Sequence, residues 1–316
     1  MPALARPHSV PVFDGAASRR HRSVPIYRLM LQALRHRRRP PTDLSRVAAL
    51  VQFVGFPRSG HTLIGAILDA HREAVIAHEL DVMGLIDAGV SRHWLYRLIL
   101  ANADRFAAAG RHWNGFCYAV PGQADTTDLP PRIIGDKKGD WVARRLLAKP
   151  ELVETLQARV RDRAKWILVT RHPLDNIATM SLRKGGHYDR LRIECPGAAF
   201  APALRAAQFD GRIAQTVRDD MIADYRSLCD GVAVLKRQID PSDWHEVQYE
   251  QVVAEPAQQI AALLRFVGLA EEADFVRRAA SIVRDGKTPS REKIAWRDEQ
   301  RAAVAELIET FDFLNP

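Results

Sequence analysis

The chain has 316 residues, 47% of them hydrophobic and 27% charged, which are the proportions of an ordinary soluble globular protein. We expect no transmembrane helix, since no apolar run approaches the roughly 18 residues needed, and no secretory signal. Three widely spaced cysteines argue against a disulfide framework or a zinc site and favour the cytoplasm. Nine arginines and two aspartates give residues 1–45 a charge of +7, nearly all of the net +8. The rest of the chain is therefore close to neutral, which argues against a domain that binds nucleic acid.

The N-terminal segment differs in composition from the rest. Residues 1 to about 24 are rich in Pro, Ser, Gly and Arg without apolar periodicity, which predicts disorder. A short basic helix is expected over residues 25–36. We favour a solvated extension, and peripheral contact with an anionic membrane is the alternative. We divide the chain into a basic, partly disordered extension (1–45) and one domain (46–316) whose folded part begins near Leu44.

The pattern of apolar residues along the domain predicts an α/β fold. Residues 48–54 form a nearly continuous apolar run, typical of a strand buried on both faces, and apolar residues at helical spacing follow from Leu63. Further strands are predicted at 74–77, 166–170 and 246–249. A helix is predicted from Pro256 to Val267, with Gly268 at its C-terminal cap. Strands that alternate with helices indicate a P-loop-like three-layer fold, in which helices flank a central parallel sheet.

The loop after the first of these strands has the spacing G-x-x-x-x-G-x-T, from Gly55 to Thr62. Glycines turn backbone amides inward, and a helix N-terminus adds partial positive charge, so a phosphate can bind there. In an ATP-binding loop a lysine follows the second glycine, but here His61 stands in that place and the cation is Arg58.

A metal-binding strand that ends in aspartate is also hard to find. The strand 166–170 ends in Arg171, and the run 133–136, ending in Asp136, is a weak candidate. A P-loop kinase or NTPase therefore stays an alternative that the sequence does not favour.

The segment Pro57-Arg58-Ser59-Gly60-His61-Thr62 resembles the first loop of the PAPS-dependent sulfotransferases (PAPS is 3′-phosphoadenosine 5′-phosphosulfate), which reads P-[KR]-S-G-T-[ST] and binds the 5′-phosphosulfate of the donor. The arginine form is similar to the tyrosyl-protein and carbohydrate branches. The family usually has Thr or Ser where this chain has His61. The resemblance implies that the donor is bound by Arg58, Ser59, Gly60, His61, Thr62 and Leu63.

Two further segments resemble the same family. After the strand 166–170, Arg171 and Thr179 stand where the family binds the 3′-phosphate, and a planar guanidinium suits that task. Taken alone, Arg171 could equally be a strand-end arginine in a surface salt bridge. The segment from Val247 resembles the family's third segment, and this resemblance implies that Tyr249 lies beside the adenine. The alternative is that Tyr249 is an ordinary tyrosine of the core. Before Trp296, the loop 286–293 suggests Lys287 and Ser290 as donor-binding residues.

The resemblance also implies a mechanism. Sulfuryl transfer is an in-line displacement, and a sulfuryl group carries less charge than a terminal phosphate, so we expect no metal. Arg58 is the candidate cation at the departing oxygen of PAP, the 3′,5′-bisphosphate product. Lys137 resembles an assisting lysine, or is a solvated loop lysine. The base is Glu79, which matches the family's glutamate, or His78, whose pKa is ordinarily closer to neutral. Alternation along a strand would place these two on opposite faces, so only one can reach the donor.

We therefore predict a sulfotransferase that moves a sulfuryl group from PAPS to a hydroxyl or amine acceptor, which could be a carbohydrate, a lipid-linked glycan, a phenol or a peptide. Besides the kinase or NTPase, a non-catalytic nucleotide-binding protein with the same fold remains an alternative.

Overall fold

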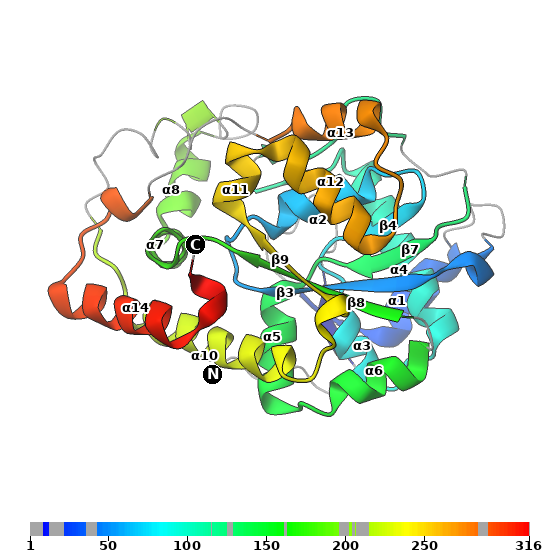
Figure 1. The fold of residues 1–316 in the computed structure, drawn as a ribbon, viewed down its shortest axis with the longest axis horizontal. Coiled ribbons are helices and arrows are strands. Elements are labelled where there is room, and N and C mark those ends of the chain that lie inside the picture. The colour runs from blue at the N-terminus through cyan, green and yellow to red at the C-terminus, as the bar shows by residue number, and fades with distance from the viewer. Residues whose placement is uncertain are drawn as a thin grey trace.

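A five-stranded parallel sheet forms the centre of the molecule, with strand order β4–β7–β3–β8–β9 (Figure 1). The computed structural model describes residues 9–12, 22–35, 43–114, 116–124, 129–160, 163–195, 202–203, 206, 215–283 and 290–315. The strands are β3 (Ala49–Gly55), β4 (Ala74–Ala77), β7 (Ile133–Asp136), β8 (Arg163–Thr170) and β9 (Trp244–Gln248). The predicted parallel sheet is confirmed. The run 133–136, considered from sequence only as a metal-binding strand, is the strand between β4 and β3.

Helices cover both faces of the sheet, because the central strand is apolar on both sides. Along β3, Val51 and Phe53 belong to one hydrophobic cluster and Leu50 and Val54 to the other. The first face is covered by α2 (His61–Asp69), α11 (Tyr249–Ala254), α12 (Pro256–Val267) and α13 (Ala273–Ala280). The second cluster contains residues of α3 (Val82–Asp87), α4 (Arg92–Ala108), α5 (Gly139–Ala148), α6 (Leu152–Val160), α7 (Pro173–Lys184), α10 (Asp219–Lys236) and α14 (Asp298–Thr310). The three-layer prediction is therefore confirmed (Figure 1).

The smaller elements lie outside this sheet. Two antiparallel pairs are β1 (Ser9–Val12) with β2 (Arg22–Pro25) and β5 (His112–Trp113) with β6 (Phe116–Cys117). Other helices that the structure describes with both ends are α1 (Ile26–Arg35), α8 (His187–Glu194) and the 3₁₀ turns η1 (Leu44–Arg46), η3 (Pro241–Asp243), η4 (Ser290–Glu292) and η5 (Asp312–Leu314). In the part of the chain that the structure describes, no helix is long and apolar enough to span a membrane.

The folded part begins earlier than the sequence predicted. Leu29 and Ala33 of α1 are buried in the same hydrophobic cluster as α4, and Gln32 accepts a hydrogen bond of 2.7 Å from Arg105 of α4. The pairing of β1 with β2 also contradicts disorder throughout residues 1–24. The short helix expected over residues 25–36 is present as α1, but the sequence did not indicate that it packs on the domain ahead of Leu44, because its contact with α4 joins segments far apart in the chain.

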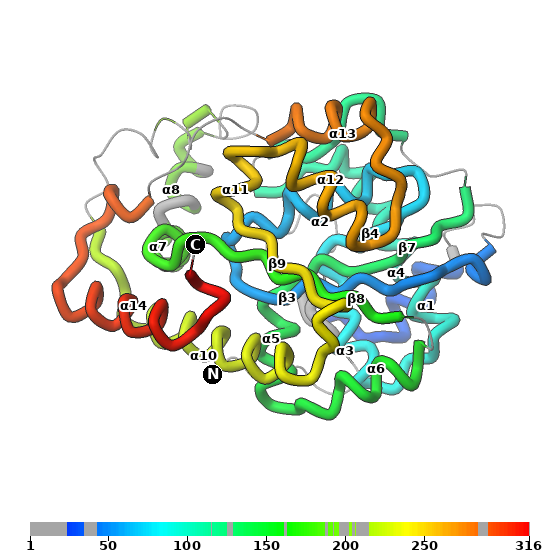
Figure 2. The backbone as a smooth tube through the Cα atoms, viewed as in Figure 1, coloured from blue at the N-terminus to red at the C-terminus, as the bar shows by residue number. Residues whose placement is uncertain are grey.

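The carboxyl ends of β3, β8 and β9 point toward the same side of the molecule, where α7 and α11 begin (Figure 2). In open parallel sheets, ligands bind at the carboxyl ends of the strands.

Candidate active site

The loop between β3 and α2 has the backbone of an anion-binding turn. Gly55, Arg58 and Gly60 all have left-handed backbone, with φ of 130°, 73° and 103°. A Cβ at Gly55 would lie 3.1 Å from the carbonyl oxygen of Val169 in β8, so the close approach of the two strands requires glycine there. Ser59 is fully buried, and α2 begins at His61. The loop therefore combines left-handed backbone with the positive end of α2, which are features of a phosphate site.

A second cluster of polar groups follows β8. The two terminal nitrogens of Arg171 lie 3.4 Å from the hydroxyl of Thr179 on α7 and 3.4 Å from the hydroxyl of Ser290 on η4. The hydroxyls of Thr179 and Ser290 lie 3.0 Å apart, and that of Thr179 donates to the carbonyl of Asp175 at 2.8 Å. The structure thus brings together three of the predicted donor-binding residues from distant parts of the sequence. Lys287 lies outside the described residues.

An ion pair that the sequence did not reveal fixes Ser290 in this cluster. The guanidinium of Arg291 donates to one oxygen of Asp175 at 2.7 and 3.1 Å, and the Arg291 backbone amide donates to the other at 2.8 Å. The indole of Trp296 donates to the carbonyl of Arg291 at 3.1 Å. These bonds hold η4 against the first turn of α7. The only signal in the sequence is Asp175 four residues after Arg171, which does not name its partner.

Tyr249 connects the two clusters. A Cβ at Gly60 would lie 2.6 Å from the Tyr249 ring, so the ring rests directly on the anion-binding loop. The Arg171 guanidinium carbon lies 5.6 Å from the centre of the same ring. The prediction of a strand over 246–249 is wrong at its end, because β9 stops at Gln248 and Tyr249 begins α11.

A buried group of charges lies beside the start of α2. Glu79 pairs with Lys137 and with Lys138, the latter at 3.1 Å, and Glu79 and both lysines are buried. The ammonium of Lys137 also donates to the hydroxyl of Thr62 at 3.0 Å. Burial lowers the pKa of Lys137, although its bond to Glu79 opposes this. The reading of Lys137 as a solvated loop lysine is therefore wrong, since it joins Glu79 to the anion-binding loop.

His78 and Glu79 point to different surroundings, but not through strand alternation, because β4 ends at Ala77. The His78 ring stacks on Phe106 with ring centres 3.9 Å apart. Burial lowers the pKa of His78 well below its ordinary value. Glu79 instead has left-handed backbone (φ 60°), which turns its side chain toward Lys137.

The segment after β4 is held by two buried acids, Asp136, which the sequence suggested only as the end of a metal-binding strand, and Asp81, which it did not single out. The carboxylate of Asp136 accepts hydrogen bonds from the amides of Leu80 at 3.0 Å and Val82 at 2.9 Å. Burial raises the pKa of Asp136 to about 7, and these two bonds oppose the rise. Asp81 accepts two bonds from Arg145, at 2.5 and 3.1 Å. Among the described residues, no group of three or more His, Cys, Asp or Glu could hold a metal ion.

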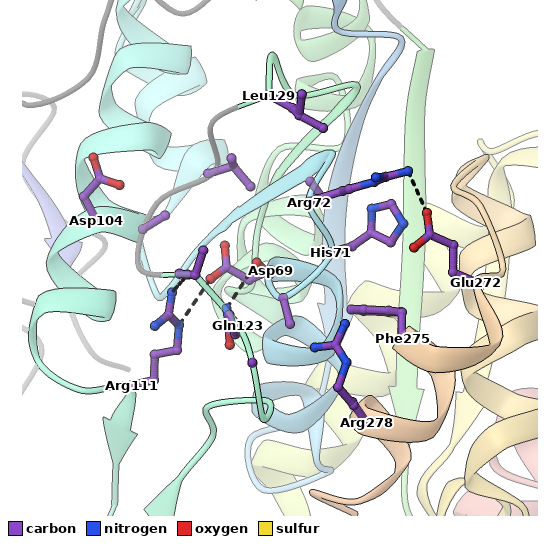
Figure 3. Close-up of a pocket in the computed structure, with 16 residues that line it drawn as sticks. Asp69, His71, Arg72, Asp104, Arg111, Gln123, Leu129, Glu272, Phe275 and Arg278 are labelled. Atoms are coloured by element: carbon purple, nitrogen blue, oxygen red, sulfur yellow. Dashed lines mark hydrogen bonds and ion pairs between the residues drawn. The ribbon is translucent and has the colours of Figure 1, made fainter.

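A cavity of about 310 Å³ lies at the other end of α2 and β4 (Figure 3). Asp69, at the last position of α2, and Arg111 line it, and Arg72 pairs with Glu272 at its rim. Since α2 runs from His61 to Asp69, about 13 Å at 1.5 Å per residue, this cavity is remote from the anion-binding loop. It is not the site described above.

Comparison with known proteins identifies the family. The sulfotransferase family model matches residues 51–273, and a search of curated proteins found no match. The solved structures similar to this chain include the sulfotransferase domain of the olefin synthase from Synechococcus PCC 7002, with 16% identity over 85% of this chain and 96% of that chain and a TM-score of 0.43. Sulfotransferase STF9 from Mycobacterium avium has 13% identity over 89% of this chain and 79% of that chain, with a TM-score of 0.44. Mouse sulfotransferase SULT7A1 in complex with PAP has 12% identity over 85% of this chain and 89% of that chain, with a TM-score of 0.38. The family match covers more than half of the chain, so the chain belongs to the sulfotransferase family.

Proposed function

We propose that the protein transfers a sulfuryl group from PAPS to a hydroxyl or amine acceptor by in-line displacement. The observation that carries the proposal is the pair of anion-binding clusters at adjacent strand ends, joined by Tyr249. The loop after β3 suits the 5′-phosphosulfate, and Arg171 with Thr179 and Ser290 suits the 3′-phosphate. A nucleotide that carries phosphate at both ends would span the two clusters, with its adenine near Tyr249.

The residues beside the loop suit the chemistry of the transfer. In the proposed reaction, the acceptor oxygen bonds to sulfur while the bond from sulfur to the bridging oxygen of the 5′-phosphate breaks. Arg58 and Lys137 are the cations for the charge that grows on that departing oxygen. Lys137 already contacts Thr62 of the loop, which supports its placement there. A sulfuryl group needs less neutralisation than a terminal phosphate, so we propose that no metal is required.

Glu79 is the proposed proton acceptor for the acceptor hydroxyl. Its contact with Lys137 places its carboxylate next to the loop. His78, the rival, is stacked on Phe106, and its lowered pKa makes it a weak base. These contacts favour Glu79.

The donor assignment is tested by calorimetry with PAP, ADP and ATP. PAP should bind far more tightly than ADP or ATP, and without Mg²⁺. Equal affinity for PAP and ADP, or a need for Mg²⁺, would instead favour a kinase or NTPase. Incubation with sulfur-labelled PAPS and a panel of sugars, lipid-linked glycans, phenols and peptides then identifies the acceptor class.

We also propose that the protein acts in the cytoplasm and contacts anionic membranes through α1. Tyr27, Leu31 and Leu34 are 59%, 49% and 48% exposed and recur at helical spacing, while Leu29 and Ala33 hold the opposite side of the helix in the core. The +7 charge of residues 1–45 suits an anionic surface. Co-sedimentation with vesicles should require phosphatidylserine and decrease with salt. Replacing the three exposed residues with Ser should abolish this co-sedimentation. If the intact protein does not bind the vesicles, the N-terminal segment is a solvated extension and not a membrane contact.

A further inference from the structure

A group of aromatic rings lies beside the proposed base. The ring of Trp113, on β5, meets the ring of His78 edge to face, with ring centres 4.7 Å apart. His78 in turn stacks on Phe106 of α4. His78 and Phe106 are buried, whereas Trp113 is partly exposed. Trp113 is therefore the member of this group that a second substrate can reach.

The Trp113 ring is also next to the groups proposed to react. The Lys137 ammonium lies 5.9 Å from the centre of that ring, within the range of a cation–π contact. The same ammonium bonds to Glu79 and to Thr62 of the anion-binding loop. Trp113 is thus separated from the Glu79 carboxylate by one ammonium group. An acceptor whose hydroxyl reaches Glu79 therefore brings the rest of its structure close to the Trp113 ring.

The hairpin of β5 and β6 is anchored on both sides of Trp113. Trp113 pairs with Phe116 of β6, and Phe116 packs against the hydrophobic core. In the turn between the two strands, Asn114 accepts a hydrogen bond of 3.3 Å from Arg183 of α7. A side chain on an anchored hairpin binds a ligand with a smaller loss of conformational freedom than one on a loose loop.

We propose that Trp113 selects the acceptor, by packing against a ring that carries the hydroxyl to be sulfated. This inference rests on the proposed sulfuryl transfer and on Glu79 as its base. An indole presents a broad, flat and apolar face, and the flat rings of phenols and sugars fit such a face. A flexible chain that ends in a hydroxyl makes less of this contact and loses more freedom on binding. The acceptor ring packs on Trp113 while its hydroxyl points to Glu79.

A second tryptophan provides the matched control. Trp141 of α5 is also partly exposed, and its ring centre lies 5.8 Å from the ammonium of Lys138. Lys138 pairs with the other oxygen of Glu79. The guanidinium of Arg145 lies 5.7 Å from the same ring, so Trp141 is engaged with two buried cations. Trp141→Ala therefore uncovers a lysine of the same ion pair without removing the proposed acceptor surface.

The test uses the complex of the full chain with PAP, in which the donor site is filled and no transfer takes place. Titrations followed by saturation-transfer NMR measure the binding of naphthol, N-acetylglucosamine and, as the flexible chain, hexanol. At least one ring probe should bind more tightly than hexanol, and which one binds distinguishes a phenol from a sugar. Trp113→Ala should weaken ring binding about 5- to 150-fold, the value of one base stacked on an aromatic side chain, and should leave PAP affinity unchanged.

The possible outcomes separate the two proposals. If the wild type does not bind PAP, the proposed function fails, and this inference with it. If the PAP complex binds neither ring probe more tightly than hexanol, or if Trp113→Ala weakens all the probes equally, the role of Trp113 fails while the donor assignment stands. An equal loss of ring binding in Trp141→Ala also overturns the proposal, because uncovering a lysine then explains the effect.

Two further variants keep the test decisive if Trp113→Ala does not fold. Trp113→Phe keeps a flat ring and should retain most of the ring binding, whereas Trp113→Leu is apolar without a flat face and should lose it. Equal binding of the ring probes by these two variants overturns the proposal.

Discussion

The removal of Arg171 gives the sharpest test of how the donor is bound. Its two contacts, to Thr179 and Ser290, are both 3.4 Å, which is long for hydrogen bonds, so little is lost when the guanidinium turns to a phosphate. A hydrogen bond to a charged group contributes about 1.5–3 kcal/mol. Arg171→Ala should therefore weaken PAP binding about 10- to 150-fold.

The assay compares PAP with AMP, which lacks the 3′-phosphate, by calorimetry on both proteins. The loss for AMP should be less than about threefold, because AMP has no group at this cluster. The PAP affinity of Arg171→Lys should lie between those of the wild type and Arg171→Ala, since an ammonium cannot make the two parallel bonds of a guanidinium. Equal losses for PAP and AMP would mean that Arg171 supports the loop structure and does not bind the 3′-phosphate.

Three further outcomes are expected. Glu79→Gln should lower turnover about 10²–10⁴-fold with little change in PAP affinity, while His78→Gln retains turnover at temperatures below its melting point; the reverse result in a sulfur-label assay would make His78 the base. Because the pKa of Asp136 is raised from 3.8 to about 7, the native state holds a proton that the unfolded chain releases, so stability should fall as the pH rises through that interval. Urea unfolding should show this slope in wild type and not in Asp136→Asn, and an equal slope in both would refute it. Deletion of residues 1–40 should lower the melting temperature, because it removes buried Leu29, whereas an unchanged melting curve would show that α1 adds no stability.

Local chemistry made several elements predictable. The helix from Pro256 to Val267 was predicted with both ends, because proline fixes its first turn and Gly268 adopts the left-handed cap (φ 83°). The strand over 74–77 was also predicted with both ends. In each case the deciding residues are neighbours in the sequence.

The partners of the site residues were not predictable, because they depend on contacts between distant segments. Arg171 and Ser290 are 119 residues apart, and no pattern in the chain joins them. Arg291 could not be distinguished from other surface arginines until Asp175 was seen beside it. The burial of Lys137 is equally non-local. It depends on Gly65 of α2, where a Cβ would lie 2.7 Å from Cγ of Lys137.

The orientation of Glu79 follows from a strained backbone that the rest of the fold holds in place. Glu79 and Asp81 both have left-handed backbone, at φ of 60° and 67°, which costs a non-glycine residue about 1–2 kcal/mol each. Asp136 offsets this cost by accepting two amides of the same segment, and Arg145 does so through its two bonds to Asp81. These bonds hold the segment in the conformation in which Glu79 pairs with Lys137. Asp136, considered from the sequence only as a metal-binding residue, and Asp81, which the sequence did not single out, therefore hold the segment that carries the proposed base, and the local backbone strain at this position supports a functional role.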